Sequence, residues 1–307
     1  MTDSSSWPPL PYPEWADTCD TLHLWMQAVG KTSLALAPFL NEYWQVAFGL
    51  TGRGMTTGLL PYRDRAVEIR FDFLDHRLLV EVTDGSHRAL DLIPRSVAAF
   101  YADYLDALNS LGIEVELNPM PSEVPNAVPL DQDIIHRAYD GAAVTRWWQV
   151  LVEIAKVLQR FRSDFAGKSS PVHFFWGSFD LAHTRFSGRP APLLEGVPRF
   201  FRLSEDQENF TCGFWPGNPT AQGATLGEPA FYAYAYPAPA GLESAAIEPV
   251  PDARFDSGLG EFLLPYESVR SQADPGSALM RFLQSTYAAA ADLGGWDRRA
   301  LEISPPV

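Results

Sequence analysis

Two runs of alternating apolar residues, separated by a short polar turn, most constrain the fold of this chain. In residues 67–73 and 78–82 nearly every second side chain is apolar, and most of the others are charged. This period of two is typical of strands with one buried face, so both runs, with a turn at Asp75 and His76, predict an antiparallel hairpin. Further strands are expected at 33–37, 43–50, 89–92 and 113–117, with a tight reversal at 51–54. The N-terminal half is therefore predicted to be an antiparallel meander.

Four segments have the apolar spacing of three and four residues that is typical of helices. They are residues 14–29, 96–111, 141–166 and 275–293. Gly30, Gly112 and Gly294 are predicted to end the first, second and fourth of these helices. Asp274 is predicted to cap the last helix, with Pro275 in its first turn.

Strands and helices are segregated along the chain rather than strictly alternating, which favours an α+β fold over a doubly wound sheet. Extended aromatic segments follow in the C-terminal half at 172–179, 210–215, 231–236 and 261–264. We expect mostly antiparallel sheets with three to four long helices, in two interlocked halves. Residues 1–118 and 134–307 would form these halves, and the proline-rich segment 119–133 would be a strap or linker within one compact unit.

The charge of the chain narrows the partners that it is expected to have. It contains 38 Asp and Glu against 23 Lys and Arg, a formal net charge of −15. The electrostatic field of a chain with this negative charge repels nucleic acid and anionic lipid. No stretch has the roughly 20 apolar residues of a membrane span, and Cys19 and Cys212 cannot form a disulfide framework. We expect a cytoplasmic protein that binds a small organic molecule and neither nucleic acid nor a membrane. A homo-oligomer is also compatible with the sequence. The sequence identifies no cofactor.

The segment from residue 173 to 189 places titratable side chains within an aromatic run. His173, Ser178, Asp180 and Arg185 fall in it, beside Trp176. Buried groups of this kind are costly unless paired, so they either satisfy one another in a structural network or line a pocket. In a pocket, His173 or Asp180 would be a general base, and Ser178 a further catalytic candidate.

Two other kinds of chemistry match this segment less well. His173, Asp180 and His183 are suitable metal ligands, but the nine residues between the histidines match no standard spacing. Ser178 follows Gly177, but the second glycine of a nucleophile elbow is missing. We therefore assign no metal-binding residue.

Other candidate ligand contacts lie far apart in the sequence. Arg53 is flanked by glycines and followed by two threonines, which suits either a carboxylate or phosphate cradle or a hairpin turn with an exposed arginine. Lys31 would contact the ligand or else cap helix carbonyl groups. His23 would contact the ligand or else pack in the core. Tyr234 is one of three tyrosines on one predicted strand face, suited to packing or to binding a flat ligand. Glu261, before an apolar run, is a candidate base or arginine partner.

Eight short motifs together resemble a bacterial family of soluble proteins of about 300 residues with no assigned function. They are WPPLPY from residue 7, TLHLW from 21, VGK from 29, RGMTT from 53, HFFWGSFD from 173, TRFSGR from 184, GFWPG from 213 and FLLPY from 262. The resemblance runs nearly end to end, so it implies a shared architecture, but it implies no reaction. This chain lacks histidines that the family pattern carries near Tyr43 and Gln45, which weakens a metal role for His183.

Three classes of function remain open on the sequence. The first is a hydrolase or transferase whose aromatic cleft, between the two halves, binds an organic molecule with an anionic group held by Arg53 or Arg185. The second is a non-catalytic binding or interaction protein, in which the same polar groups form a buried network. The third is a metal-dependent enzyme. A catalytic cleft requires at least two of these titratable side chains to converge on solvent-reachable space.

Overall fold

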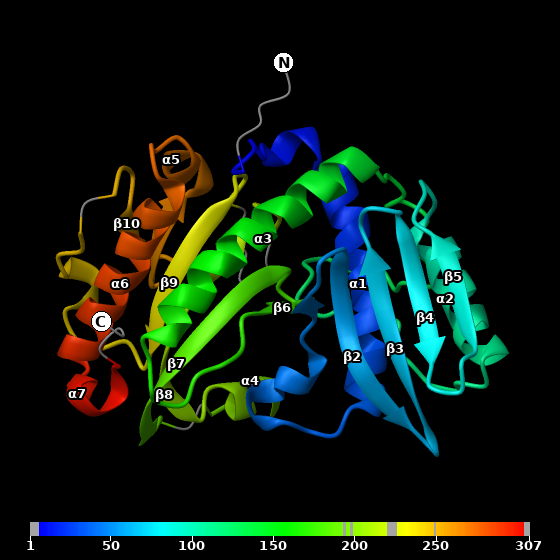
Figure 1. Ribbon diagram of the computed structural model, residues 1–307, viewed down its shortest axis with the longest axis horizontal. Helices are drawn as coiled ribbons and strands as arrows, with labels where there is room; N and C mark the ends of the chain where they lie inside the picture. Colours follow the sequence, from blue (N-terminus) through cyan, green and yellow to red (C-terminus); the bar gives the residue numbers. More distant parts are fainter. Residues whose placement is uncertain (1–5, 193–194, 197–198, 220–225, 249, 304–307) are drawn as a thin grey trace.

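Two antiparallel sheets form the framework of the protein in the computed structural model, which describes residues 6–192, 195–196, 199–219, 226–248 and 250–303 (Figure 1). The five-stranded sheet follows the chain order: β1 (Gly49–Leu50), β2 (Gly54–Tyr62), β3 (Arg65–Asp72), β4 (Arg77–Val82) and β5 (His87–Asp91). The six-stranded sheet has the order β10 (Arg254–Asp256), β11 (Glu261–Pro265), β9 (Ala230–Tyr236), β8 (Gln207–Trp215), β7 (Asp180–Pro190) and β6 (His173–Phe175). The predicted hairpin is β3 and β4, with Val67 opposite Val82 and Phe71 opposite Leu78.

Four long helices pack with these sheets: α1 (Ala16–Leu36), α2 (Val97–Ser110), α3 (Gly141–Ser163) and α6 (Pro275–Leu293). The shorter helices are α4 (Arg199–Ser204), α5 (Tyr266–Arg270), α7 (Arg298–Leu301), η1 (Tyr12–Glu14), η2 (Asn41–Val46) and η3 (Leu242–Ser244). Side chains of Ser96, Asp140 and Asp274 accept hydrogen bonds from the first-turn amides of α2, α3 and α6. This arrangement confirms the predicted α+β class and its long helices.

The two halves are joined by backbone and by aromatic packing. Phe48, just before β1, and Phe174 of β6 exchange two backbone hydrogen bonds of 2.8 Å, so the two sheets meet edge to edge. Trp147 of α3 lies 5.9 Å from Phe73, which follows β3, and 5.2 Å from Phe179, which precedes β7, measured between ring centroids. In Figure 1, α3 accordingly runs across both sheets. A single hydrophobic core therefore includes residues from both halves.

Four local predictions are wrong. Gly30 does not end the first helix: α1 continues to Leu36, so residues 33–37 form no strand. Gly30 is instead buried in the helix against Trp176, where a Cβ atom would lie 2.2 Å from the indole ring.

The strand predicted at residues 43–50 is interrupted because Tyr43 has a positive φ of 58° within η2. Residues 113–117 pair with no described strand, although the amide of Glu114 donates a hydrogen bond to the Tyr62 hydroxyl group.

Sequence periodicity did not reveal the strand β7. This strand determines which side chains reach the candidate functional site described below. It pairs with β8 from Leu181 to Pro190, and its side chains alternate between the two faces of the sheet.

None of the helices in the described ranges has the length and apolar character needed to cross a membrane.

Candidate functional site

A cleft of about 1030 Å³ lies on one face of the six-stranded sheet. Alternate side chains of β7, from Asp180 to Phe186, line it together with residues of β8, β9 and β11. Segments from η2, α4 and the strap at residues 122–123 complete its wall. The cleft therefore collects side chains from both halves of the chain onto one face of a rigid sheet.

Carboxyl groups and aromatic rings dominate this lining. The carboxyl groups belong to Glu42, Glu123, Asp180, Glu205 and Glu261. The rings belong to Tyr43, Trp44, Phe175, Trp176, Phe186, Phe200, Trp215, Tyr232, Tyr234 and Tyr236. Among the described residues that line the cleft there is no lysine, arginine or histidine. The cleft is thus acidic and aromatic.

Asp180, at the start of β7, is held by two hydroxyl groups. Ser178 donates a hydrogen bond to its Oδ1 atom and Tyr232 donates one to its Oδ2 atom. Gly213 makes the second contact feasible, because a Cβ there would lie 2.4 Å from the hydroxyl oxygen of Tyr232. Burial raises the pKa of Asp180 to about 6, and the two hydroxyl donors limit that rise.

Glu261, the first residue of β11, faces the same cleft with an unsatisfied carboxyl group. Its side chain is only 6% exposed, and its Oε2 atom has no hydrogen-bond partner among the described residues. Burial, followed by the nearby charge of Asp180, raises the pKa of Glu261 to about 8. A buried carboxyl oxygen without a partner is costly, and a bound ligand can supply that partner.

Glu123 brings a third carboxyl group to this end of the cleft from the proline-rich strap. Its Oε1 atom packs on Gly177 so closely that a Cβ there would lie 2.3 Å from it. Burial and then the charge of Asp180 raise the pKa of Glu123 to about 7. Three carboxyl groups with unequal proton affinities therefore face one end of the cleft.

An aromatic row extends from this end along the sheet. The rings of Trp215 and Tyr232 stack with centroids 4.2 Å apart, and Tyr232 stacks on Tyr234 at 6.2 Å. The Tyr234 hydroxyl donates to Glu205 over 3.5 Å, and Asn209 Nδ2 donates to the same carboxyl group over 2.6 Å. Burial raises the pKa of Glu205 to about 7, against the effect of these two donors. Glu205 therefore marks a second acidic position along the row.

Helix α1 supports the cleft from behind through two polar side chains. Gln27 exchanges two hydrogen bonds with the backbone of Ser122, at 2.7 and 2.9 Å, and so holds the strap next to Glu123. His23 Nε2 lies 3.0 Å from the Gly177 carbonyl oxygen, beside Ser178. Burial lowers the pKa of His23 to about 4, so its ring is neutral near pH 7. His23 is therefore a core histidine and does not line the cleft.

The structure brings together half of the residues that the sequence singled out. Trp176, Ser178, Asp180, Tyr234 and Glu261 all line the cleft. The remaining candidates are His173, Arg53, Arg185, Lys31 and His23, and they lie outside its lining.

His173 and Arg185 are enclosed by aromatic rings and do not line the cleft; His173 lies behind the lining residues Phe175 and Trp44. The His173 ring centroid lies 4.6 Å from that of Phe175, and burial lowers the pKa of His173 to about 4. Arg185 lies on the opposite face of β7 from Asp180, where its guanidinium is 3.5 Å from the Phe161 ring centroid and donates to the Phe161 carbonyl oxygen. Neither residue is placed to serve as a base or to hold an anion in the cleft. Lys31 is likewise buried, in α1, and burial lowers its pKa.

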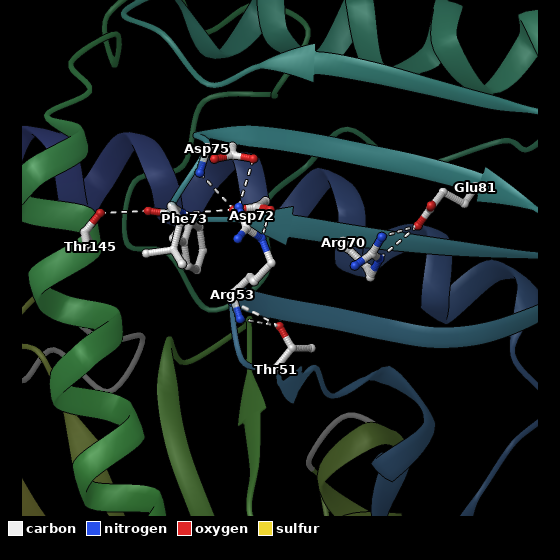
Figure 2. Close-up of polar contacts among 10 residues, drawn as sticks. Thr51, Arg53, Arg70, Asp72, Phe73, Asp75, Glu81 and Thr145 are labelled. Carbon is white, nitrogen blue, oxygen red and sulfur yellow. Dashed lines mark hydrogen bonds and ion pairs between the residues drawn. The ribbon is translucent and has the colours of Figure 1, made fainter.

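Arg53 stabilises a surface turn, as Figure 2 shows. Its guanidinium pairs with Asp72 at 2.5 Å and with Asp75 at 2.8 Å, and 46% of its side chain is exposed. Asp72 also accepts hydrogen bonds from the amides of Leu74 and Asp75, which order the turn after β3. The environment of Arg53 is therefore that of an exposed arginine in a hairpin turn, and not that of an anion cradle.

The Arg53→Ala variant tests this assignment. The Arg53 side of the ion pairs is screened by water and salt, and Asp72, which is only 9% exposed, keeps the amides of Leu74 and Asp75 as donors, so we expect only a small decrease in melting temperature. Binding of any ligand to the cleft should be unchanged, because Arg53 is absent from the lining. A calorimetric comparison with the wild-type protein checks both points, and a loss of binding would return Arg53 to the site.

Sequence reasoning missed Glu123, Glu205 and Tyr232. Tyr232 shares a strand face with Tyr234, so period-two alternation was a signal for it. Glu123 and Glu205 lie outside regular strands and long helices, and no periodicity pointed to them.

No group of three or more histidine, cysteine or acidic residues in the described ranges is arranged to hold a metal ion. A model of a family of unknown function, DUF5996, matches residues 7–303 and confirms the resemblance to an uncharacterised family of this length. No curated protein and no solved structure matches the chain significantly.

Proposed function

The chain belongs to the DUF5996 family of unknown function, and we propose that it is a hydrolase-type enzyme acting on a small organic molecule in its acidic, aromatic cleft. The observation that carries this proposal is the pairing of Asp180, which two hydroxyl groups hold in place, with Glu261, whose buried Oε2 atom has no partner. Both carboxyl groups line the same cleft. Two carboxyl groups in unlike environments are a common basis for acid–base catalysis.

The environments of the two groups support different roles. With the pKa of Asp180 near 6 and that of Glu261 near 8, Asp180 is mostly ionised and Glu261 mostly protonated at pH 7. Asp180 would remove a proton from water as the water oxygen bonds to the substrate. Glu261 would donate its proton to the departing oxygen or nitrogen as that bond breaks. Transfer of one proton from Asp180 to Glu261 through solvent then restores both groups.

Other cleft residues would orient this chemistry. Ser178 and Tyr232 fix both oxygens of Asp180, which limits its rotation and keeps its charge directed into the cleft. Trp176 donates its indole N–H to the Val46 carbonyl oxygen over 2.8 Å, so its ring is held as one wall. The convergence of several titratable groups on open space favours an enzyme over the buried structural network. The lining does not fit an anionic ligand, because carboxyl groups would repel it.

A panel of chromogenic esters, amides and glycosides tests the proposal. We expect the wild-type protein to hydrolyse at least one class, and Asp180→Asn to lower that rate by roughly 10²–10⁴-fold, the typical contribution of a general base. Glu116→Gln, which changes an exposed carboxyl group outside the lining, is the matched control and should have no effect. Ligand binding without turnover of any substrate would instead support the non-catalytic alternative.

A further inference from the structure

Resting on this proposed function, we propose that the substrate carries a protonated amino group, which binds between the Glu205 carboxylate and the aromatic rings beside it. The acid–base pair defines where a bond is cleaved, and Glu205 would define which molecules are brought to it. The inference therefore concerns the substrate class of the same site.

The charge balance of the cleft is the first argument. Of its five carboxyl groups, only Glu42 has a cationic partner among the described residues, Lys168, at 2.7 Å. The Oε2 atom of Glu261, in a side chain only 6% exposed, has no hydrogen-bond partner among the described residues, and a bound ligand can supply one. An organic cation complements this lining, whereas an anion does not.

The protein already binds one ammonium group in this manner. Lys168 Nζ contacts the Glu42 carboxylate and lies 4.5 Å from the ring centroid of Phe186 and 5.7 Å from that of Trp44. A carboxylate together with aromatic faces is a favourable environment for an ammonium group. Lys168 occupies this arrangement at Glu42, and a ligand would occupy the corresponding one at Glu205.

Glu205 has the required neighbours. It follows α4 directly, and η2 packs against α4. Phe200 of α4 and Tyr43 of η2 line the cleft with ring centroids 5.1 Å apart, and Tyr234 reaches Glu205 from β9. An ammonium group there would meet a carboxylate on one side and aromatic rings on the others.

The charged groups near Glu205 are consistent with a cation site. Glu42 and Asp206 add to the attraction, while Lys168 is bound to Glu42 and Arg202, in the last turn of α4, is exposed to solvent. Asn209 and Tyr234 donate hydrogen bonds to Glu205 and carry no charge near pH 7. No lysine, arginine or histidine among the described residues of the lining competes with the ligand.

The spacing relates this position to the reacting groups. Tyr232 bonds to Asp180 and Tyr234 bonds to Glu205, and the two rings are 6.2 Å apart. Residues two apart on a strand are separated by about 7 Å. The proposed substrate therefore carries its amine and its cleaved bond at neighbouring positions along this row.

Three probes of equal length separate charge from shape: n-hexylamine, 1-hexanol and hexanoate. We expect hexylamine to bind the wild-type protein roughly tenfold more tightly than hexanol, with hexanoate weaker still, as measured by titration calorimetry. Glu205→Gln should reduce hexylamine to the affinity of hexanol, and Glu116→Gln should leave the preference intact. Equal binding of amine and alcohol, a preference that survives Glu205→Gln, or no binding of any probe would overturn the inference.

The pH dependence gives a second readout, compared between the wild-type protein and Glu205→Gln because Asp180, Glu123 and Glu261 also titrate between about pH 6 and 8. Binding requires ionised Glu205, and the amine stays protonated well above pH 8, so hexylamine affinity should increase several-fold from pH 6 to pH 8. A flat or opposite dependence would contradict the assignment.

The two proposals fail in different ways. Turnover of neutral substrates without amine preference would remove this inference and leave the hydrolase. Amine binding without any turnover sensitive to Asp180→Asn would keep the ligand class and remove the hydrolase.

Discussion

Replacing Gly30 by alanine is expected to destabilise the protein by about 2–4 kcal/mol. The added Cβ would lie 2.2–2.3 Å from three atoms of the Trp176 indole, so the ring must leave its position. Trp176 is buried and hydrogen-bonded to Val46, and removal of such a ring costs roughly 3–5 kcal/mol. Alanine recovers about 1 kcal/mol of helix propensity, so the net loss remains large. Urea unfolding measures it.

Two comparisons isolate the cause. Gly276 in α6 has its nearest neighbours 3.6 and 3.7 Å from the Cβ position, so Gly276→Ala should be neutral or stabilising. In a Trp176→Ala background, Gly30→Ala should also become stabilising, by up to about 1 kcal/mol, because only the helix propensity remains. If Gly30→Ala is as stable as the wild type, the close contact with Trp176 is not what requires glycine here.

Gly30 also shows where reasoning from local sequence ends. A glycine after an apolar helical run is a typical stop signal, and Gly112 follows that rule with φ of 70° after α2. Gly30 departs from it: α1 continues through Gly30 to Leu36, and the glycine leaves room for Trp176, far away in the sequence, which packs on that position. Elements with strong periodicity and caps, such as β3, β4, α2, α3 and α6, were predicted well because neighbouring residues determine them.

The site was predicted in part for a similar reason. The aromatic segment around Trp176, Ser178 and Asp180 was found, since polar groups among aromatic residues are conspicuous in sequence. Arg185 was assigned to the same cleft because the strand β7 was not recognised. Asp180 and Arg185 are five positions apart, and an odd separation on one strand places side chains on opposite faces. Glu123 and Glu205 depend on tertiary packing alone.

Glu261→Gln is expected to lower turnover by roughly 10²–10⁴-fold where the leaving group needs a proton. Glutamine keeps the shape of the side chain but cannot act as an acid. In the wild-type protein the rate should fall below about pH 6, as Asp180 becomes protonated, and above about pH 8, as Glu261 loses its proton. The variant should lose the alkaline limb and keep the acidic one. A pH–rate profile on the substrate identified by the panel measures both.

The leaving group provides the sharpest control for this assignment. A p-nitrophenolate departs without protonation, so Glu261→Gln should affect a p-nitrophenyl substrate far less than the matching alkyl substrate. Asp180→Asn should slow both equally, because a base that activates water is needed in each case. A Glu261→Gln defect that is the same for both leaving groups would remove Glu261 as the acid. It would leave that carboxyl group a role in binding, where its unpartnered oxygen would accept or donate one hydrogen bond to the ligand.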